Sequence, residues 1–99
     1  MRILAVGDVI GKSGIDCLKE KLSKITQENN IDFVIVNAEN TGDGMGITAG
    51  SYKELSNLGI NVMTLGNHTW SKKDVFSLLD NENLIRPANF YKDLKGKRI

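Results

Sequence analysis

The chain has 99 residues, of which 40% are hydrophobic and 25% are charged, and its formal net charge is +1. These values are typical of one small folded domain, exclude intrinsic disorder and give no strong signal for a nucleic-acid partner. The single cysteine excludes an internal disulfide and a zinc site made of cysteines alone. No apolar run is long enough for a membrane span or a signal-peptide core, so we expect a cytoplasmic protein without membrane contact.

Short apolar runs alternate with helical patterns along the chain. The runs at residues 2–7, 32–37 and 60–65 are rich in aliphatic and β-branched residues, which predicts buried parallel strands. A weaker fourth strand is expected at residues 84–86, just before the only proline. Between the first two runs, apolar residues recur at spacings of three and four, which places one face of a helix on Ile15, Leu18, Leu22 and Ile25.

Two further helices are expected around residues 52–58 and 75–79, where apolar side chains again recur at helical spacing. Thr48 is positioned to cap the start of the second helix. Two serines, each followed by an aspartate three residues later, have capping-box spacing: Ser13 with Asp16, and Ser71 with Asp74.

The alternation of strands and helices predicts an α/β fold, with a parallel sheet built from βαβ units and flanking helices on both faces. In such folds the functional groups gather beyond the carboxyl ends of the strands. The residues that follow each predicted strand are therefore the candidates for chemistry.

Polar residues stand at three of these strand ends. Asp8 follows the first strand, Glu39 and Asn40 follow the second, and Asn67 and His68 follow the third. Each residue alone is more often a turn former or a structural hydrogen-bonding group than a ligand. Oxygen ligands and an imidazole at one edge of a sheet, however, suit a divalent metal and a phosphate bound to it.

Two glycine-rich segments allow weaker interpretations. Residues 7–13 resemble a phosphate-binding P-loop, but only three residues separate the glycines and no Gly-x-Gly follows the strand, which excludes a P-loop and a dinucleotide fingerprint. Residues 41–48 contain three glycines at alternate positions. This loop either lines or closes a substrate site or is a connection without a role, and the sequence leaves both open.

Four motifs together resemble the YmdB-like family, a bacterial branch of the calcineurin-like metallophosphoesterases. They are Gly-Asp-Val-Ile-Gly at 7–11, Asn-Ala-Glu-Asn at 37–40, Gly-Asn-His-Thr-Trp at 66–70 and Arg-Pro-Ala-Asn at 86–89. The resemblance implies a metallophosphoesterase-type α/β sandwich and a two-metal phosphodiesterase that hydrolyses 2′,3′-cyclic mononucleotides.

The resemblance also implies roles for the strand-end residues. Asp8 would bind the first metal, Glu39 would bridge both metals, Asn40 and Asn67 would bind the second, and His68 would donate a proton. Mixed oxygen and nitrogen ligation is compatible with two ions of manganese, iron or zinc.

Members of the family are considerably longer, and their C-terminal half supplies several histidines, whereas this chain has one. The resemblance therefore implies that residues 1–99 are the N-terminal part of a metallophosphoesterase domain. We expect this part to be inactive alone and to associate with itself or with the missing C-terminal half. Two alternatives stay open: a non-catalytic α/β binding or assembly module, and a metal-free, flavodoxin-like phosphate- or nucleotide-binding domain.

Overall fold

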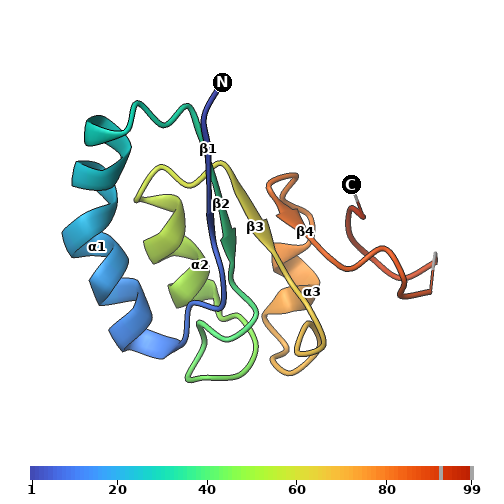
Figure 1. Cartoon of the computed structure of the whole chain (residues 1–99). Coiled ribbons are helices and arrows are strands. Elements are labelled where there is room, and N and C mark those ends of the chain that lie inside the picture. The colour runs from blue at the N-terminus through green and yellow to red at the C-terminus, as the bar shows by residue number, and fades with distance from the viewer. Residues whose placement is uncertain (92, 99) are drawn as a thin grey trace.

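The computed structural model describes residues 1–91 and 93–98, and strands and helices alternate along them as the sequence predicts (Figure 1). The elements in chain order are β1 (Ile3–Val6), α1 (Gly11–Glu28), β2 (Phe33–Asn37), α2 (Ala49–Ser56), β3 (Val62–Thr64), α3 (Val75–Leu78) and β4 (Leu84–Ile85). Within the described ranges, none of the helices is both long and apolar enough to cross a membrane.

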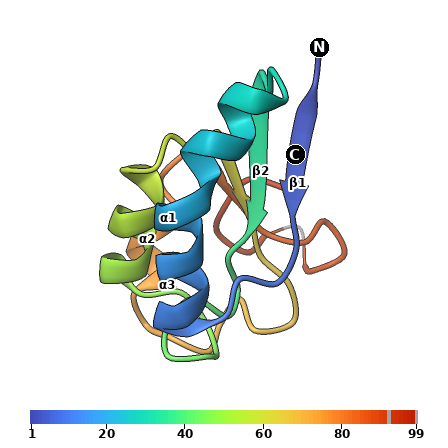
Figure 2. The ribbon, with the colours of Figure 1, turned by 60° about the vertical axis from the view of Figure 1, so that its left-hand side comes forward.

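The four strands form one parallel sheet in the order β1-β2-β3-β4. The strand order never reverses, so every crossover moves to the next strand in the same direction. Because such crossovers share one hand, the helices are placed on the same face of the sheet. The predicted α/β fold with a parallel sheet is confirmed, but the helices α1, α2 and α3 lie on one face, as Figure 2 shows, and not on both.

The hydrophobic core lies between the sheet and this helix layer. Alternate strand residues point into it, and Val36, Met63 and Leu84 are fully buried. From the helix layer, the core receives Ile15 and Leu22 of α1, Leu55 of α2, and Val75 and Leu78 of α3. The helix layer therefore covers one face of all four strands.

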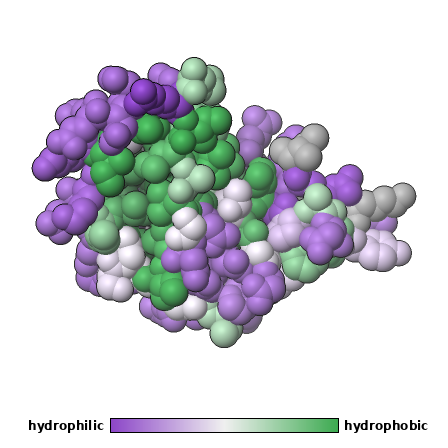
Figure 3. Space-filling view, in the orientation of Figure 1, coloured by the Kyte–Doolittle hydropathy of each residue, from purple (hydrophilic) through white to green (hydrophobic). Residues whose placement is uncertain are grey.

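Among the described residues, no helix lies over the opposite face of the sheet. We call it the bare face; it carries the alternate strand residues Ile3, Phe33, Ile35, Val62 and Ile85. Ile3 is 56% exposed, and the other four are half-buried. Figure 3 looks onto this side of the molecule and shows a broad hydrophobic surface over the strands. Parallel sheets normally have both faces covered, so this surface is unusual for a strand set of this composition.

The segment after β4 is organised around one buried arginine. Arg86 is 2% exposed, and its guanidinium donates hydrogen bonds to the carbonyl oxygens of Pro87, Tyr91, Leu94 and Lys95. Buried polar groups need such partners, because leaving them unsatisfied costs stability. Residues 87–91 and 93–95 therefore fold around the Arg86 side chain.

Candidate metal centre

The loops after β1, β2 and β3 meet at the carboxyl edge of the sheet, at the lower end of Figure 1. Backbone hydrogen bonds continue the sheet beyond the strand ends. The Val9 N–H donates to the Asn37 carbonyl at 3.2 Å, and the Gly11 N–H donates to the Asn40 carbonyl at 2.9 Å. These bonds hold the first two loops side by side, although about 30 residues separate them along the chain.

Asp8 occupies a sharp turn between β1 and α1. Its φ is +43°, a left-handed conformation that aspartate tolerates better than most residues. Its carboxylate Oδ1 accepts a hydrogen bond of 2.7 Å from the Asn40 side-chain amide. The turn thus directs the Asp8 side chain toward the loop after β2.

Asn40 connects Asp8 to His68. Because the Asn40 Nδ2 donates to Asp8, its Oδ1 faces the imidazole and lies 2.6 Å from the His68 Nδ1. An amide oxygen only accepts, so this network assigns a proton to Nδ1 of His68. The other ring nitrogen, Nε2, lies 3.4 Å from Nδ2 of Asn67.

Glu39 lies at the centre of the cluster. Its Oε2 accepts a hydrogen bond of 2.9 Å from the His68 backbone N–H and lies 3.9 Å from the His68 Nδ1. The side chain is 15% exposed. Its other oxygen, Oε1, packs against Gly66, and no described residue donates a hydrogen bond to it.

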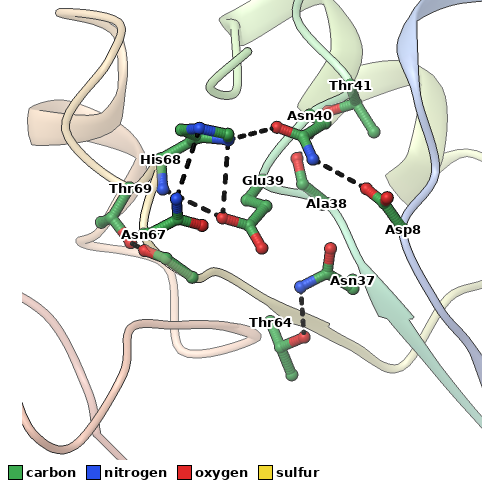
Figure 4. Close-up of polar contacts among 11 residues, drawn as sticks. Asp8, Asn37, Ala38, Glu39, Asn40, Thr41, Thr64, Asn67, His68 and Thr69 are labelled. Atoms are coloured by element: carbon green, nitrogen blue, oxygen red, sulfur yellow. Dashed lines mark hydrogen bonds and ion pairs between the residues drawn. The ribbon is translucent and has the colours of Figure 1, made fainter. Parts of the chain in front are cut away.

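The five residues that the sequence singles out come together at this edge, as Figure 4 shows. Asp8, Glu39, Asn40, Asn67 and His68 are joined by one chain of polar contacts from three loops.

Gly66, for which the sequence predicts no role, packs directly against the Glu39 carboxylate. The sequence also predicts none for Thr69, which is fully buried and whose hydroxyl donates to the Gly66 carbonyl. The only sequence signal for either is their place in the Gly-Asn-His-Thr motif.

The donor set fits part of the coordination of a divalent cation. Two carboxylates, two amides and one imidazole are the ligand types that manganese, iron and zinc share. The described residues hold no cluster of three His, Cys, Asp or Glu side chains that would bind a metal without other ligands. The amide oxygens, water and groups from outside these residues must therefore complete any metal site here.

A parallel α/β sheet with these groups at its carboxyl edge is the arrangement expected of a protein of the metallophosphoesterase type. The family model described as "YmdB-like protein" matches residues 4–99, and the chain belongs to the YmdB-like family. The resemblance seen in the sequence motifs is thereby confirmed.

Two curated relatives support the assignment. The chain is 44% identical to the 2′,3′-cyclic-nucleotide 2′-phosphodiesterase of Bacillus subtilis, over 100% of the chain and 38% of that protein. It is 39% identical to a putative phosphatase/phosphodiesterase of Mycoplasma pneumoniae, over 90% of the chain and 32% of that protein. The chain thus spans about a third or slightly more of the length of these relatives.

Two solved structures have the same fold over nearly the whole chain. One is a hypothetical protein from Thermus thermophilus, with a TM-score of 0.90, 37% identity and coverage of 98% of this chain and 38% of that one. The other is a novel phosphatase from Mycoplasma pneumoniae, with a TM-score of 0.90, 36% identity and coverage of 96% and 36%. The predicted metallophosphoesterase-type fold is confirmed by these neighbours.

Proposed function

We propose that this chain carries the N-terminal part of the catalytic domain of a metal-dependent phosphodiesterase that hydrolyses 2′,3′-cyclic mononucleotides. The observation that carries the proposal is the polar cluster at the carboxyl edge, where Asp8, Glu39, Asn40 and His68 are linked by three hydrogen bonds of 2.6–2.9 Å. The name of the Bacillus subtilis relative and membership of the family support the substrate class.

The proposed ligand roles follow the donor types. Asp8 would bind a first divalent cation, Glu39 would bridge two cations, and Asn40 and Asn67 would bind the second cation with neutral amide oxygens. Neutral ligands leave net positive charge for a phosphate. When bound, two cations of manganese, iron or zinc would supply an activated water and would stabilise charge on the phosphoryl group.

His68 is the proposed proton donor. In the hydrolysis, the hydroxyl of a water forms a new bond to phosphorus, and the bond from phosphorus to one ribose oxygen breaks. The imidazole gives a proton to that ribose oxygen. The attacking water releases one proton, which replaces the proton that the imidazole gave. The contacts of His68 with Asn40 and Asn67 hold the ring at the rim of the cluster, within reach of a leaving group.

The proposal includes a partner for the chain. Asp8, Glu39, Asn40 and Asn67 do not saturate two transition metals between them, so we expect the remaining ligands to come from a region outside residues 1–99. We place that region, or a second copy of the chain, on the bare face, and we expect the chain alone to be inactive. The exposed free thiol of Cys17 suits a reducing compartment such as the cytoplasm.

The test is hydrolysis of 2′,3′-cyclic AMP with added Mn²⁺ by the complete gene product that contains these residues. We expect Glu39→Gln to lose more activity than His68→Ala, because loss of the bridge disturbs both cations. Loss of the proton donor alone should reduce the rate of hydrolysis by about 10²–10⁴-fold. Melting temperatures of both variants serve as the folding control. A smaller loss for Glu39→Gln would contradict its bridging role. Failure of the unaltered protein to cleave any cyclic nucleotide with Mn²⁺, Fe²⁺ or Zn²⁺ would instead favour a non-catalytic module.

A further inference from the structure

Gly66 packs against the Glu39 carboxylate in the candidate metal centre. A Cβ atom on Gly66 would lie 2.5 Å from Cδ and from Oε2 of Glu39, and closer still to Oε1. Atoms in protein interiors do not approach this closely without something moving. A side chain at position 66 and the observed place of the carboxylate therefore exclude each other.

The backbone at position 66 does not itself require glycine. Gly11 and Gly46 have positive φ angles of +58° and +85°, but Gly66 has no positive φ. An alanine fits its conformation without backbone strain. Position 66 requires glycine because the carboxylate of Glu39 occupies the space that a side chain would take.

The two backbone segments are held in place, so neither moves easily to make room. The Ala38 N–H donates to the Thr64 carbonyl at 2.8 Å, which ties the start of the Glu39 loop to β3. The Leu65 N–H donates to the Ile85 carbonyl at 3.0 Å, which ties the residue before Gly66 to β4. A methyl group at position 66 would therefore displace the Glu39 side chain first.

The turn that starts at Gly66 also holds the carboxylate from another direction. Both the N–H and the hydroxyl of the buried Thr69 donate to the Gly66 carbonyl. This closed turn presents the His68 N–H to Oε2 of Glu39 at 2.9 Å. One carboxylate oxygen is thus held by a backbone donor, while Oε1 has no donor among the described residues.

We propose that Gly66 is a positioning residue for the metal site: because it has no side chain, the Glu39 carboxylate can pack against it and is held where it would bind the cations. The expected effect on metal binding rests on the proposed function. The contact itself does not depend on that function.

The contact is tested by a double-mutant cycle on the chain without metal, in which urea denaturation measures the stability of each variant. We expect Gly66→Ala to lower the denaturation midpoint in the unaltered background and to have a clearly smaller effect in the Glu39→Ala background, since the obstructing carboxylate is gone. If Gly66→Ala alone does not fold, folding of the double variant supports the contact. An equal loss in both backgrounds, or failure of both variants to fold, would overturn the proposal.

The consequence is tested by Mn²⁺ titration of the complete gene product, with free Mn²⁺ read by electron paramagnetic resonance. Both Gly66→Ala and Glu39→Gln should weaken Mn²⁺ binding at least tenfold. Gly50→Ala is the matched control, because a Cβ there meets only Oγ1 of Thr48 at 3.9 Å, and it should leave the affinity unchanged. Binding by Gly66→Ala as tight as in the unaltered protein would refute the positioning role. No Mn²⁺ binding by the unaltered protein would count against the proposed function, and the cycle would still decide the contact.

Discussion

The two faces of the β-sheet carry similar apolar residues but have different surroundings. On the helix-covered face, Val36, Met63 and Leu84 are fully buried. On the bare face, Ile3 is largely exposed, and Ile35 is only half-buried. The strands themselves are thus apolar on both sides, although the helices of the described residues cover one side.

Strands that are apolar on both sides indicate that a second layer packs on the bare face, opposite the helix layer. Continuous apolar strands are typical of sheets covered on both faces. The curated relatives are about two and a half to three times as long as the part that the chain matches. We therefore infer that stability resides in the helix-covered face and that the bare face is the surface for association. Three substitutions separate these roles.

The largest effect is expected on the covered face of β3. Met63→Ala removes a fully buried side chain and should reduce the free energy of unfolding by about 2–5 kcal/mol. Val62→Ala, the neighbouring residue on the bare face, is the matched control and should cost clearly less. Urea denaturation of both variants measures the difference. Equal losses would show that the two faces contribute alike.

A smaller effect is expected in the helix layer. The Thr48 hydroxyl accepts a hydrogen bond from the Ser51 N–H at 3.0 Å, and the Ser51 hydroxyl accepts one from the Thr48 N–H, which forms a capping box for α2. Thr48→Ala should cost about 1 kcal/mol, whereas Thr48→Ser should cost little. If denaturation shows the same stability for both variants, the cap does not stabilise the helix layer.

The smallest effect on stability, but the largest on assembly, is expected at Ile3. Ile3→Lys places a charge on the bare face and should change the free energy of unfolding by no more than about 0.5 kcal/mol. It should also weaken self-association, because a desolvated lysine opposes apolar contact. Size-exclusion chromatography with light scattering measures the mass of both proteins. A monomer before substitution, or an unchanged oligomer after it, would contradict association through this face.

The sequence was most informative where local pattern decides structure. The β-branched runs placed all four strands to within two residues, and Thr48 caps α2 as predicted. The apolar periodicity also identified α1, where Ile15 and Leu22 are buried.

Two predicted capping boxes are wrong, and each for a reason outside the local pattern. The helix α1 already begins at Gly11, so Ser13 lies inside it, and Ile10 precedes it without a side-chain cap. The carboxylate of Asp74 does not cap its own helix, but accepts a hydrogen bond of 2.8 Å from the Ala49 N–H at the start of α2. That partner is 25 residues away in sequence, so no local spacing predicts it.

The sequence predicts which residues form the site, but not how they are arranged. Parallel strands bring their carboxyl ends to one edge, so the meeting of Asp8, Glu39 and His68 follows from the strand pattern. The left-handed turn at Asp8 and the packing of Gly66 against Glu39 depend on how separate loops fit together. Such details arise from tertiary packing and have no signature in spacing alone.

Binding of divalent metal at the carboxyl edge of the sheet is tested most directly by adding Mn²⁺ to the ¹⁵N-labelled chain in solution. Paramagnetic broadening detects weak binding, which suits a site that lacks part of its ligands. We expect selective loss of the amide signals of residues 8–11, 39–41 and 66–69, reduced in Glu39→Gln, with the signals of Ile3 and the end of α1 retained. Broadening that centres elsewhere, or that is unchanged in Glu39→Gln, would contradict the assignment of the metal site.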